Sequence, residues 1–382
     1  MKRLTSALLA LLLCLTLLPT TVMAAEPTPK EWSGTVINPL YADVMTEEDL
    51  LTWEEAKALD AKEQPLSANE MQTYNAAVYV NKEQVVEAIR AQMVRRVSAI
   101  EIHCSSSIAT TSQASELIVL AMEHGRGGKD APKSGDSLLY EYGGWNCAMS
   151  TSGTTVTIRY AMTYYTTASQ ERQLDWKIEA LKNQLDLTNT RTTAYEKVVA
   201  IHEWIKQKVE YGGSGCIQYT AYGAAVNGLA VCQGYSVLFY RLAMEAGIDA
   251  RVVSGWGNGG RHAWNIVQLG QKYYLLDCTW DENTNSNQYF LKGSTWFYGA
   301  GDHVPSGEEI GGNPDYTSAA FNANISTVDY QLGTGSVPGM VLTLNNSRQP
   351  VVQWTAISGA TAYEVYRSTN GTDFSIVRRS SA

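Results

Sequence analysis

The chain has 382 residues, enough for two or three domains, and 45% of them are apolar, enough to form a buried core in each. It carries 29 Lys and Arg against 38 Asp and Glu, a net charge of −9. This acidic balance argues against proteins that bind nucleic acid through a basic face, so we expect no nucleic-acid partner.

Residues 1–25 have the three-part layout of a secretory signal peptide. Lys2 and Arg3 precede an apolar run over 7–18, and the small-residue stretch Val22-Met23-Ala24-Ala25 follows. Such a run spans about 18 Å as a helix, less than the roughly 30 Å hydrocarbon core of a bilayer. We therefore expect a cleaved, bacterial-type signal, a secreted or cell-surface protein, and no membrane span.

The next two segments predict a leader and a small domain. Residues 26–75 are acidic and proline-containing, which predicts an irregular leader with one short helix near 47–59. Residues 76–189 predict a small α+β domain with a connecting helix. Its expected elements are a helix capped by Asn81, a strand at 97–104, a helix at 112–124, two strands around 138–147 and 155–165 turned at Ser152-Gly153, and a polar helix at 169–187.

Residues 190–316 place chemically useful side chains at the ends of regular elements. Apolar residues at helical spacing predict a helix around His202, which we interpret as a packed or surface histidine. A second helix begins at Cys232 and ends at Gly247. Two strands follow, one beginning at His262 and one ending at Asp277. The pattern predicts one helix packed beside an antiparallel hairpin.

Cys232, His262 and Asp277 fit the roles of nucleophile, base and orienting carboxylate. The unpaired amides at a helix N-terminus favour a thiolate and can donate to an oxyanion. Side chains alternate faces along a strand, so His262 and Asp277 share a face if Gln268 pairs with either Gln271 or Tyr273. A packed thiol, an incidental histidine and a turn-capping Asp277 are the alternative readings of each residue taken alone.

This segment resembles a transglutaminase-like domain of the papain-like cysteine-enzyme superfamily. The resemblance rests on five ordered motifs, which are Ala221-Tyr222-Gly223, Val231-Cys232-Gln233-Gly234-Tyr235-Ser236, Gly247-Ile248-Asp249-Ala250-Arg251-Val252-Val253-Ser254-Gly255, His262-Ala263-Trp264-Asn265 and Leu276-Asp277-Cys278-Thr279-Trp280-Asp281. It implies an α+β fold with a helix packed on an antiparallel sheet, and Cys232, His262 and Asp277 as the catalytic residues. It implies no cofactor and no metal, since Asp281 and Glu282 alone are too sparse a ligand set for calcium.

Three further residues are candidates for the oxyanion or substrate site. Gln218 and Tyr222 lie upstream of Cys232 and carry side-chain donors, although packing is the alternative role for both. Trp256 lies in a Gly-rich loop and could wall a substrate groove. We interpret His303 as a loop histidine outside the triad.

The cysteine count is odd once Cys14 of the signal is set aside. Cys104, Cys147, Cys216, Cys232 and Cys278 remain, so an exported protein should keep one thiol free. If Cys232 is that thiol, the other four allow three pairings. Cys104 with Cys147 and Cys216 with Cys278 would be the local choice.

The C-terminal region predicts a different module. Residues 317–335 form a linker, and 336–382 predict short strands with a hairpin turn at Asn370-Gly371. Trp354, Tyr363 and Phe374 lie in a pattern that resembles the first half of a fibronectin type III domain. Because such a sandwich needs about 100 residues, we expect this β-sandwich to be truncated.

The expected function is a secreted thiol-dependent enzyme that acts on peptide or protein amide bonds through an acyl-enzyme on Cys232. Resolution by water would make it a cysteine peptidase or amidase, and resolution by an amine would make it a protein-glutamine acyltransferase; the sequence leaves both open. Cell-surface or cell-wall peptides are the expected substrates. The alternative is a non-catalytic adhesion or scaffold protein that uses the same fold as a binding module.

Overall fold

The computed structural model describes residues 32–38, 45–109, 111–123, 132–306, 316, 318–331, 341–345, 350–354, 362–368 and 374–381. The described residues up to Val328 form one compact unit, and those from Asp329 form a second. Helices and antiparallel sheets are mixed in this chain, as the predicted α+β class requires. The predicted signal peptide lies outside the described residues. Within them, no helix has both the length and the apolar character needed to cross a membrane.

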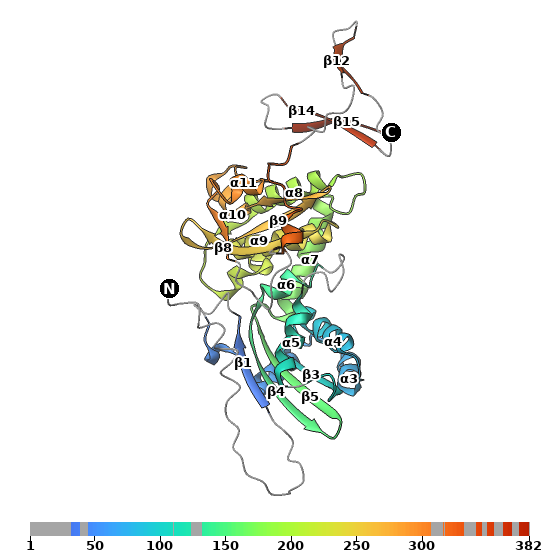
Figure 1. Cartoon of the computed structure of the whole chain (residues 1–382), viewed down its shortest axis with the longest axis vertical. Coiled ribbons are helices and arrows are strands. Elements are labelled where there is room, and N and C mark those ends of the chain that lie inside the picture. The colour runs from blue at the N-terminus through green and yellow to red at the C-terminus, as the bar shows by residue number, and fades with distance from the viewer. Residues whose placement is uncertain are drawn as a thin grey trace. The chain divides into compact units, whose positions relative to one another are not determined.

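A five-stranded sheet organises the N-terminal half, in the order β1-β4-β5-β3-β2 (Figure 1). All neighbouring pairs are antiparallel except β2 with β3. The β4–β5 hairpin turns through Gly153 in the left-handed region, φ 60°, at the predicted turn. The strands are β1 (Trp32–Ile37), β2 (Val78–Tyr79), β3 (Ala99–Ser105), β4 (Tyr142–Ser152) and β5 (Thr155–Tyr164).

The helices of this half are built on regular caps. Thr52 and Thr167 each form a reciprocal capping box with the residue three positions on, which fixes the start of α2 and of α7. Figure 1 shows α4 and α5 side by side along the sheet. The bounds are η3 (Glu47–Asp49), α2 (Trp53–Glu63), α3 (Ala68–Ala76), α4 (Lys82–Val94), α5 (Thr111–Met122), α6 (Asp136–Leu139) and α7 (Ala168–Gln184).

The prediction of an irregular leader over 26–75 is wrong for its described residues. β1 is an edge strand of the five-stranded sheet, and α2 packs Ala56 against Ala99 and Ala161 of that sheet. β1 is short, has Gly34 at its centre, and makes its only ladder with a strand more than 100 residues away. Local patterning therefore carried little signal for it.

A four-stranded antiparallel sheet organises the second half, in the order β10-β9-β8-β11. Helix α9 packs against β8 and β9, the arrangement that the resemblance implied (Figure 1). The elements are α8 (Ala194–Lys208), β6 (Glu210–Tyr211), η4 (Cys216–Tyr219), a π-helical turn η5 (Gly223–Asn227), β7 (Leu229–Ala230), α9 (Cys232–Glu245), β8 (Ala250–Gly257), β9 (Gly260–Leu269), β10 (Lys272–Leu276), α10 (Cys278–Thr284), α11 (Ser294–Phe297), β11 (His303–Pro305) and α12 (Ala319–Asn322).

The register of the β9–β10 hairpin is one of the two that the sequence favoured. Gln268 lies opposite Tyr273, and Leu276 lies opposite Asn265. Asp277 follows directly after β10, so its side chain shares the face of His262. The hairpin therefore delivers an imidazole and a carboxylate to the same side of the sheet.

Residues 134–141 of the preceding half are built into the second half. Asp136 Oδ2 accepts from the backbone N of Val252 at 2.7 Å, and Glu141 Oε1 accepts from the backbone N of Ala221 at 2.8 Å. The side-chain amide of Gln233, next to Cys232, donates to the Tyr140 carbonyl at 2.6 Å. The base of α9 is thus held from outside the predicted catalytic segment.

The described residues of the second unit, taken by themselves, form two strand pairs. β12 (Val341–Leu344) pairs with β13 (Pro350–Gln353), and β14 (Ala362–Ser368) pairs with β15 (Phe374–Ser381), both antiparallel. A register shift between Val365 and Tyr366 interrupts the second pair. The fibronectin type III resemblance stays a prediction.

Candidate active site

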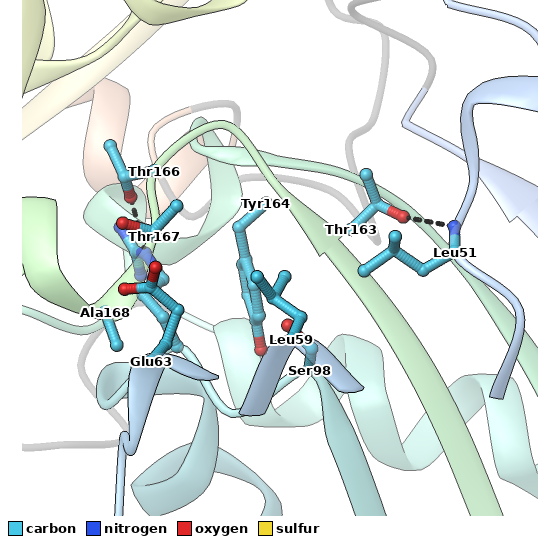
Figure 2. A pocket seen from close by; sticks show the side chains of 10 residues that line it. Leu51, Leu59, Glu63, Ser98, Thr163, Tyr164, Thr166, Thr167 and Ala168 are labelled. Carbon is cyan, nitrogen blue, oxygen red and sulfur yellow. Dashed lines mark hydrogen bonds between the residues drawn. The ribbon is translucent and has the colours of Figure 1, made fainter. Parts of the chain in front are cut away.

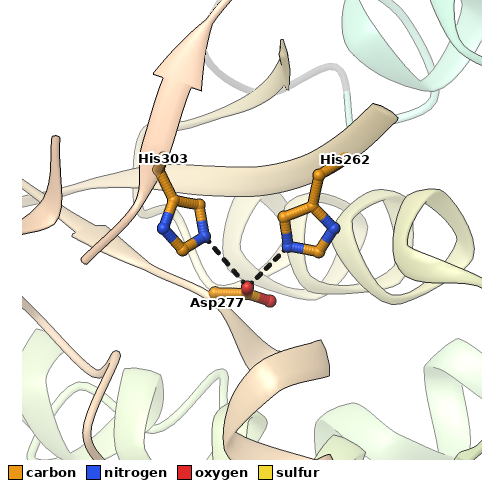
Figure 3. Close-up of side chains that lie close together, drawn as sticks. All are labelled: His262, Asp277 and His303. Carbon is orange, nitrogen blue, oxygen red and sulfur yellow. Dashed lines mark hydrogen bonds and ion pairs between the residues drawn. The ribbon is translucent and has the colours of Figure 1, made fainter. Parts of the chain in front are cut away.

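Asp277 is the centre of a buried hydrogen-bond cluster (Figure 3). Its Oδ1 accepts from the backbone N of Thr279 at 2.9 Å and of Trp280 at 3.2 Å, so Asp277 is also the N-cap of α10. Its Oδ2 lies 2.7 Å from Nε2 of His262 and 3.1 Å from Nε2 of His303. The carboxylate is fixed in orientation before it meets either ring.

His262 connects this carboxylate to the sulfur at the start of α9. Nε2 of His262 faces Asp277, which leaves Nδ1 as the other nitrogen of the ring, and the Cys232 side chain is close enough to help raise the pKa of His262. Cys232 is the first residue of α9, preceded by Val231 as N-cap. The structure therefore brings the three predicted residues together in the order sulfur, imidazole, carboxylate.

The opposite charges in this cluster stabilise one another, and this outweighs the unfavourable effect of burial on each charged group. Burial opposes a charge on His262, but the Asp277 charge, the hydrogen bond that Asp277 accepts and the nearby Cys232 side chain outweigh it and raise the pKa of His262 to about 10. Burial likewise opposes a charge on Asp277, yet His262 and His303 hold the pKa of this carboxyl below its usual range. At neutral pH the ring is a proton donor beside a permanent anion.

Trp280 covers the His262 ring, a contact that the sequence analysis did not assign. The two rings are stacked with centroids 4.9 Å apart and an interplanar angle of 21°. A side chain at Gly257 would meet Trp280 at 2.8 Å and His262 at 3.2 Å, so this glycine leaves room for the stack. Trp280 shields the imidazole from water, and only 8% of His262 is exposed.

His303 belongs to the cluster, and its interpretation as a loop histidine is wrong. It begins β11, pairs with Gly257 of β8, and is fully buried. More than 40 residues separate the two strands, so no local pattern could place His303 beside Asp277. A histidine that begins a three-residue strand is a weak signal even in retrospect.

Residues 180–278 match the family model of the Transglutaminase-like superfamily. This part of the chain is a transglutaminase-like domain. The chain is also similar to kyphoscoliosis peptidase of Homo sapiens, with 30% identity over 112 residues that cover 25% of this chain and 17% of that protein. For the Mus musculus protein the identity is 28% over 133 residues, covering 29% and 20%. The chain thus spans about a fifth of the length of these curated relatives.

One of the similar solved structures is titled "Crystal structure of a TGase". It is 17% identical, covers 48% of this chain and 51% of that chain, and has a TM-score of 0.27.

The other cysteines are free thiols, so the local disulfide pairs are not formed. Cys104 on β3 and Cys147 on β4 are separated by β5, about 9–10 Å across two strand spacings, beyond the roughly 7 Å reach of a disulfide. Cys216 is exposed on η4, whereas Cys278 is buried at the start of α10. The prediction of these two local disulfides is therefore wrong.

These four thiols contrast with Cys232 in their surroundings. Burial raises the pKa of Cys104 to about 11 and that of Cys147 to about 12. Burial also raises the pKa of Cys278 and of Cys216. Of the five described cysteines, only Cys232 lies against an imidazole that a carboxylate orients.

The structure places the three candidate oxyanion or substrate residues of the transglutaminase-like domain in different surroundings. The Gln218 carbonyl accepts from the backbone N of Val231 at 3.0 Å, which places Gln218 beside the start of α9. The Tyr222 hydroxyl donates to Gln173 of α7 at 3.2 Å, a packing role. Trp256 is 41% exposed on β8, with the Arg261 guanidinium 5.7 Å from its ring.

Two tyrosines near the sulfur were missed by the sequence analysis. Burial is the largest cause that raises the pKa of Tyr211 and of Tyr219, and the Cys232 charge is the second. Tyr211 is 50% exposed, and Tyr219 is half-buried. Both hydroxyls therefore lie within electrostatic range of the thiol.

A cavity of about 120 Å³ lies elsewhere, between α2, β5 and the start of α7 (Figure 2). It shares no residue with the Cys232 cluster. Its charged groups are already satisfied, since Arg96 pairs with Glu141 and Glu171, and Glu63 accepts from Ser169. We assign it no part in the chemistry.

His262, Asp277 and His303 also offer three potential metal-ligand atoms within 4.8 Å of one another. The 2.7 Å contact from His262 to Asp277 is a hydrogen-bond length, shorter than the roughly 3.3 Å between ligands of a tetrahedral zinc ion. Asp281, one of the two candidate calcium ligands, already accepts from the Tyr289 backbone N at 2.9 Å. The cluster fits a proton-transfer site better than a metal site.

Proposed function

We propose that this protein is an exported thiol-dependent enzyme that acts on peptide or protein amide bonds through an acyl-enzyme on Cys232. The observation that carries the proposal is the buried hydrogen bond between Asp277 and His262, together with the electrostatic influence of the Cys232 side chain, at the start of α9, on the His262 ring. The predicted signal over residues 1–25 supports export, and the acidic net charge of −9 agrees with a peptide substrate better than with nucleic acid.

Each proton in the reaction has a defined place. The Cys232 sulfur attacks the amide carbon while its proton resides on His262. His262 then gives that proton to the leaving amine, and the carbon–nitrogen bond breaks to leave a thioester. A water molecule or a second amine loses its proton to His262, attacks the thioester, and releases the thiol. Asp277 keeps the ring oriented and does not itself become protonated.

The start of α9 supplies the donors for the oxyanion. The first amides of a helix have no partner within the helix and point at its N-terminus, where the developing negative charge would lie. We assign the second donor to the side-chain amide of Gln218, whose backbone is tied to Val231. Tyr211 and Trp256 provide exposed aromatic surface for the substrate chain, and Tyr219 is half-buried.

Hydrolysis is the outcome that we favour over amine transfer. The named relatives of the transglutaminase-like domain are called peptidases, although the similarity covers only a fifth of their length. Peptides of the cell surface or cell wall are the substrates that we propose for an exported enzyme of this kind. Amine transfer would require a site that excludes water until the amine arrives.

The first experiment asks which thiol reacts. Iodoacetamide at neutral pH, followed by peptide mapping, should label Cys232, because the pKa of each of the other four described thiols is raised. Cys232→Ala should abolish labelling and turnover with little change in thermal midpoint. Cys216→Ser is the matched control, since Cys216 is exposed and should not matter. A label that maps elsewhere, or no label at all, would favour a non-catalytic adhesion or scaffold protein.

The second experiment separates the two reactions. Incubation with a peptide library and a labelled primary amine should give cleavage products without incorporated amine if the enzyme is a hydrolase. Incorporation of the amine at glutamine would instead establish acyl transfer, and Cys232→Ala controls for background in both cases.

A further inference from the structure

His303 makes two polar contacts and is fully buried. Its Nε2 lies 3.1 Å from Asp277 Oδ2, and its Nδ1 lies 2.7 Å from the carbonyl oxygen of Gly301. The ring is fully buried among Trp264, Trp280 and Phe297, with the Phe297 centroid 4.0 Å away. Both contacts are therefore with protein acceptors and not with water.

Both partners are acceptors, and this constrains the state of the ring. A carbonyl oxygen accepts only, and so does an ionised carboxylate; a neutral imidazole has a single N–H. Asp277 is held ionised by two backbone amides and by His262, so its Oδ2 has no proton to offer to His303. Only the imidazolium form of His303 can donate to Gly301 and Asp277 together.

We propose that His303 is a positioning residue of this site, a buried imidazolium that fixes the Asp277 carboxylate and neutralises part of its charge. The inference rests on the proposed function, because it assigns His303 an effect on the acid–base behaviour of His262. Two rings share one carboxylate oxygen, and their centroids are 5.4 Å apart. A cation at that distance disfavours the proton on His262, so His262 gives it up more readily to the leaving amine than it would beside Asp277 alone.

The other ionisable groups around the two rings come from several elements. They include Cys232 of α9, which influences the pKa of His262, Asp281 of α10, Tyr289 after α10, Asp302 before β11, and Tyr211 of β6. The Asp281 carboxylate is engaged by His202, and that of Asp302 accepts from the backbone N of Asn258. Of the groups named here, His303 is therefore the positive charge that competes with His262 for Asp277.

The state of the ring can be measured directly in the unaltered protein. With ¹⁵N-labelled histidine and long-range ¹H–¹⁵N NMR at neutral pH, His303 should show protons on both ring nitrogens. His303→Asn identifies the resonance. A neutral tautomer would overturn the proposal, whatever the activity of the enzyme.

The effect on His262 can be measured with variants of the full chain. His303→Gln keeps a donor toward Asp277 but removes the charge, so the alkaline inflection in the rate of Cys232 alkylation should rise by roughly one pH unit. His202→Gln is the matched control, because it removes a buried histidine of the same domain that contacts a different aspartate, at 3.0 Å. Its inflection should stay at the wild-type value.

The outcomes distinguish this proposal from the proposed function. If wild-type Cys232 is not alkylated at all, the enzyme proposal fails. If Cys232 is alkylated and the inflection of His303→Gln does not move, His303 is only a packing residue and the enzyme proposal survives. A lower kcat in His303→Asn than in His303→Gln, with KM unchanged, would support positioning through the Asp277 contact.

Discussion

Two of the buried histidine–aspartate contacts described in the first unit have the same composition. His202 lies 3.0 Å from Asp281 and His262 lies 2.7 Å from Asp277. An aromatic ring covers each imidazole, Phe290 at 4.5 Å in one case and Trp280 at 4.9 Å in the other.

The two contacts differ in what meets the other ring nitrogen. His202 lies in the middle of α8, and Glu203 is its nearest charged neighbour there, at 3.6 Å. His262 instead meets a thiol at the start of a helix. The same hydrogen-bonded pair therefore joins α8 to α10 in one place and prepares a proton transfer in the other. A histidine–aspartate pair alone does not identify an active site.

The largest expected effect comes from exchanging each carboxylate for its amide. Asp277→Asn keeps an acceptor for α10 but would present an N–H to His262, which reverses the ring's tautomer. We expect kcat/KM to fall by roughly 10³–10⁴-fold, the size of the effect in other triads of this logic. Asp281→Asn should leave the activity of the folded protein nearly unchanged. Equal losses in the two variants would show that the contacts do not differ in role.

The second effect concerns the pH dependence of stability. Because the pKa of folded His262 is raised from 6.5 to about 10, the folded state binds this proton more tightly than the unfolded state does. The stabilisation is complete below pH 6.5 and is lost as the pH rises through about 10, with a change in the free energy of unfolding of at most about 5 kcal/mol.

Urea denaturation between pH 6 and 10 measures this loss. In His262→Gln, the free energy of unfolding should no longer fall as the pH rises toward 10. The pKa of His202 is also raised, so His202→Gln serves as the comparison. A stability curve of His262→Gln with the wild-type slope would contradict the assignment.

The smallest effect concerns the covering rings. Trp280→Ala should open His262 to water and lower kcat by about tenfold, because a hydrated imidazole is less well oriented toward the sulfur. Phe290→Ala should lower the thermal midpoint and leave kcat unchanged. A kcat loss in Phe290→Ala, or none in Trp280→Ala, would remove the distinction between the two rings.

The sequence predicts features that depend on residues close together in the chain, and it misses features that depend on residues far apart. The helix that begins at Cys232 and the β9–β10 hairpin are local, so residue type and alternation placed His262 and Asp277 on one face. His303 and β1 depend on pairing with strands far away in the chain, and neither was predicted. The expected disulfides failed for a related reason, since sequence distance does not show that β5 lies between Cys104 and Cys147.

The buried segment 134–141 affects where the chain can be divided into separately folding pieces. The family match begins at residue 180, yet Val252, Ala221 and Gln233 donate to residues that precede it. A fragment cut at that boundary would lose the acceptors of the Val252 and Ala221 backbone amides, at a cost of about 1–3 kcal/mol for each that stays buried, while Gln233 would keep its contact with the Tyr219 carbonyl. A fragment designed to fold by itself should therefore begin before residue 134.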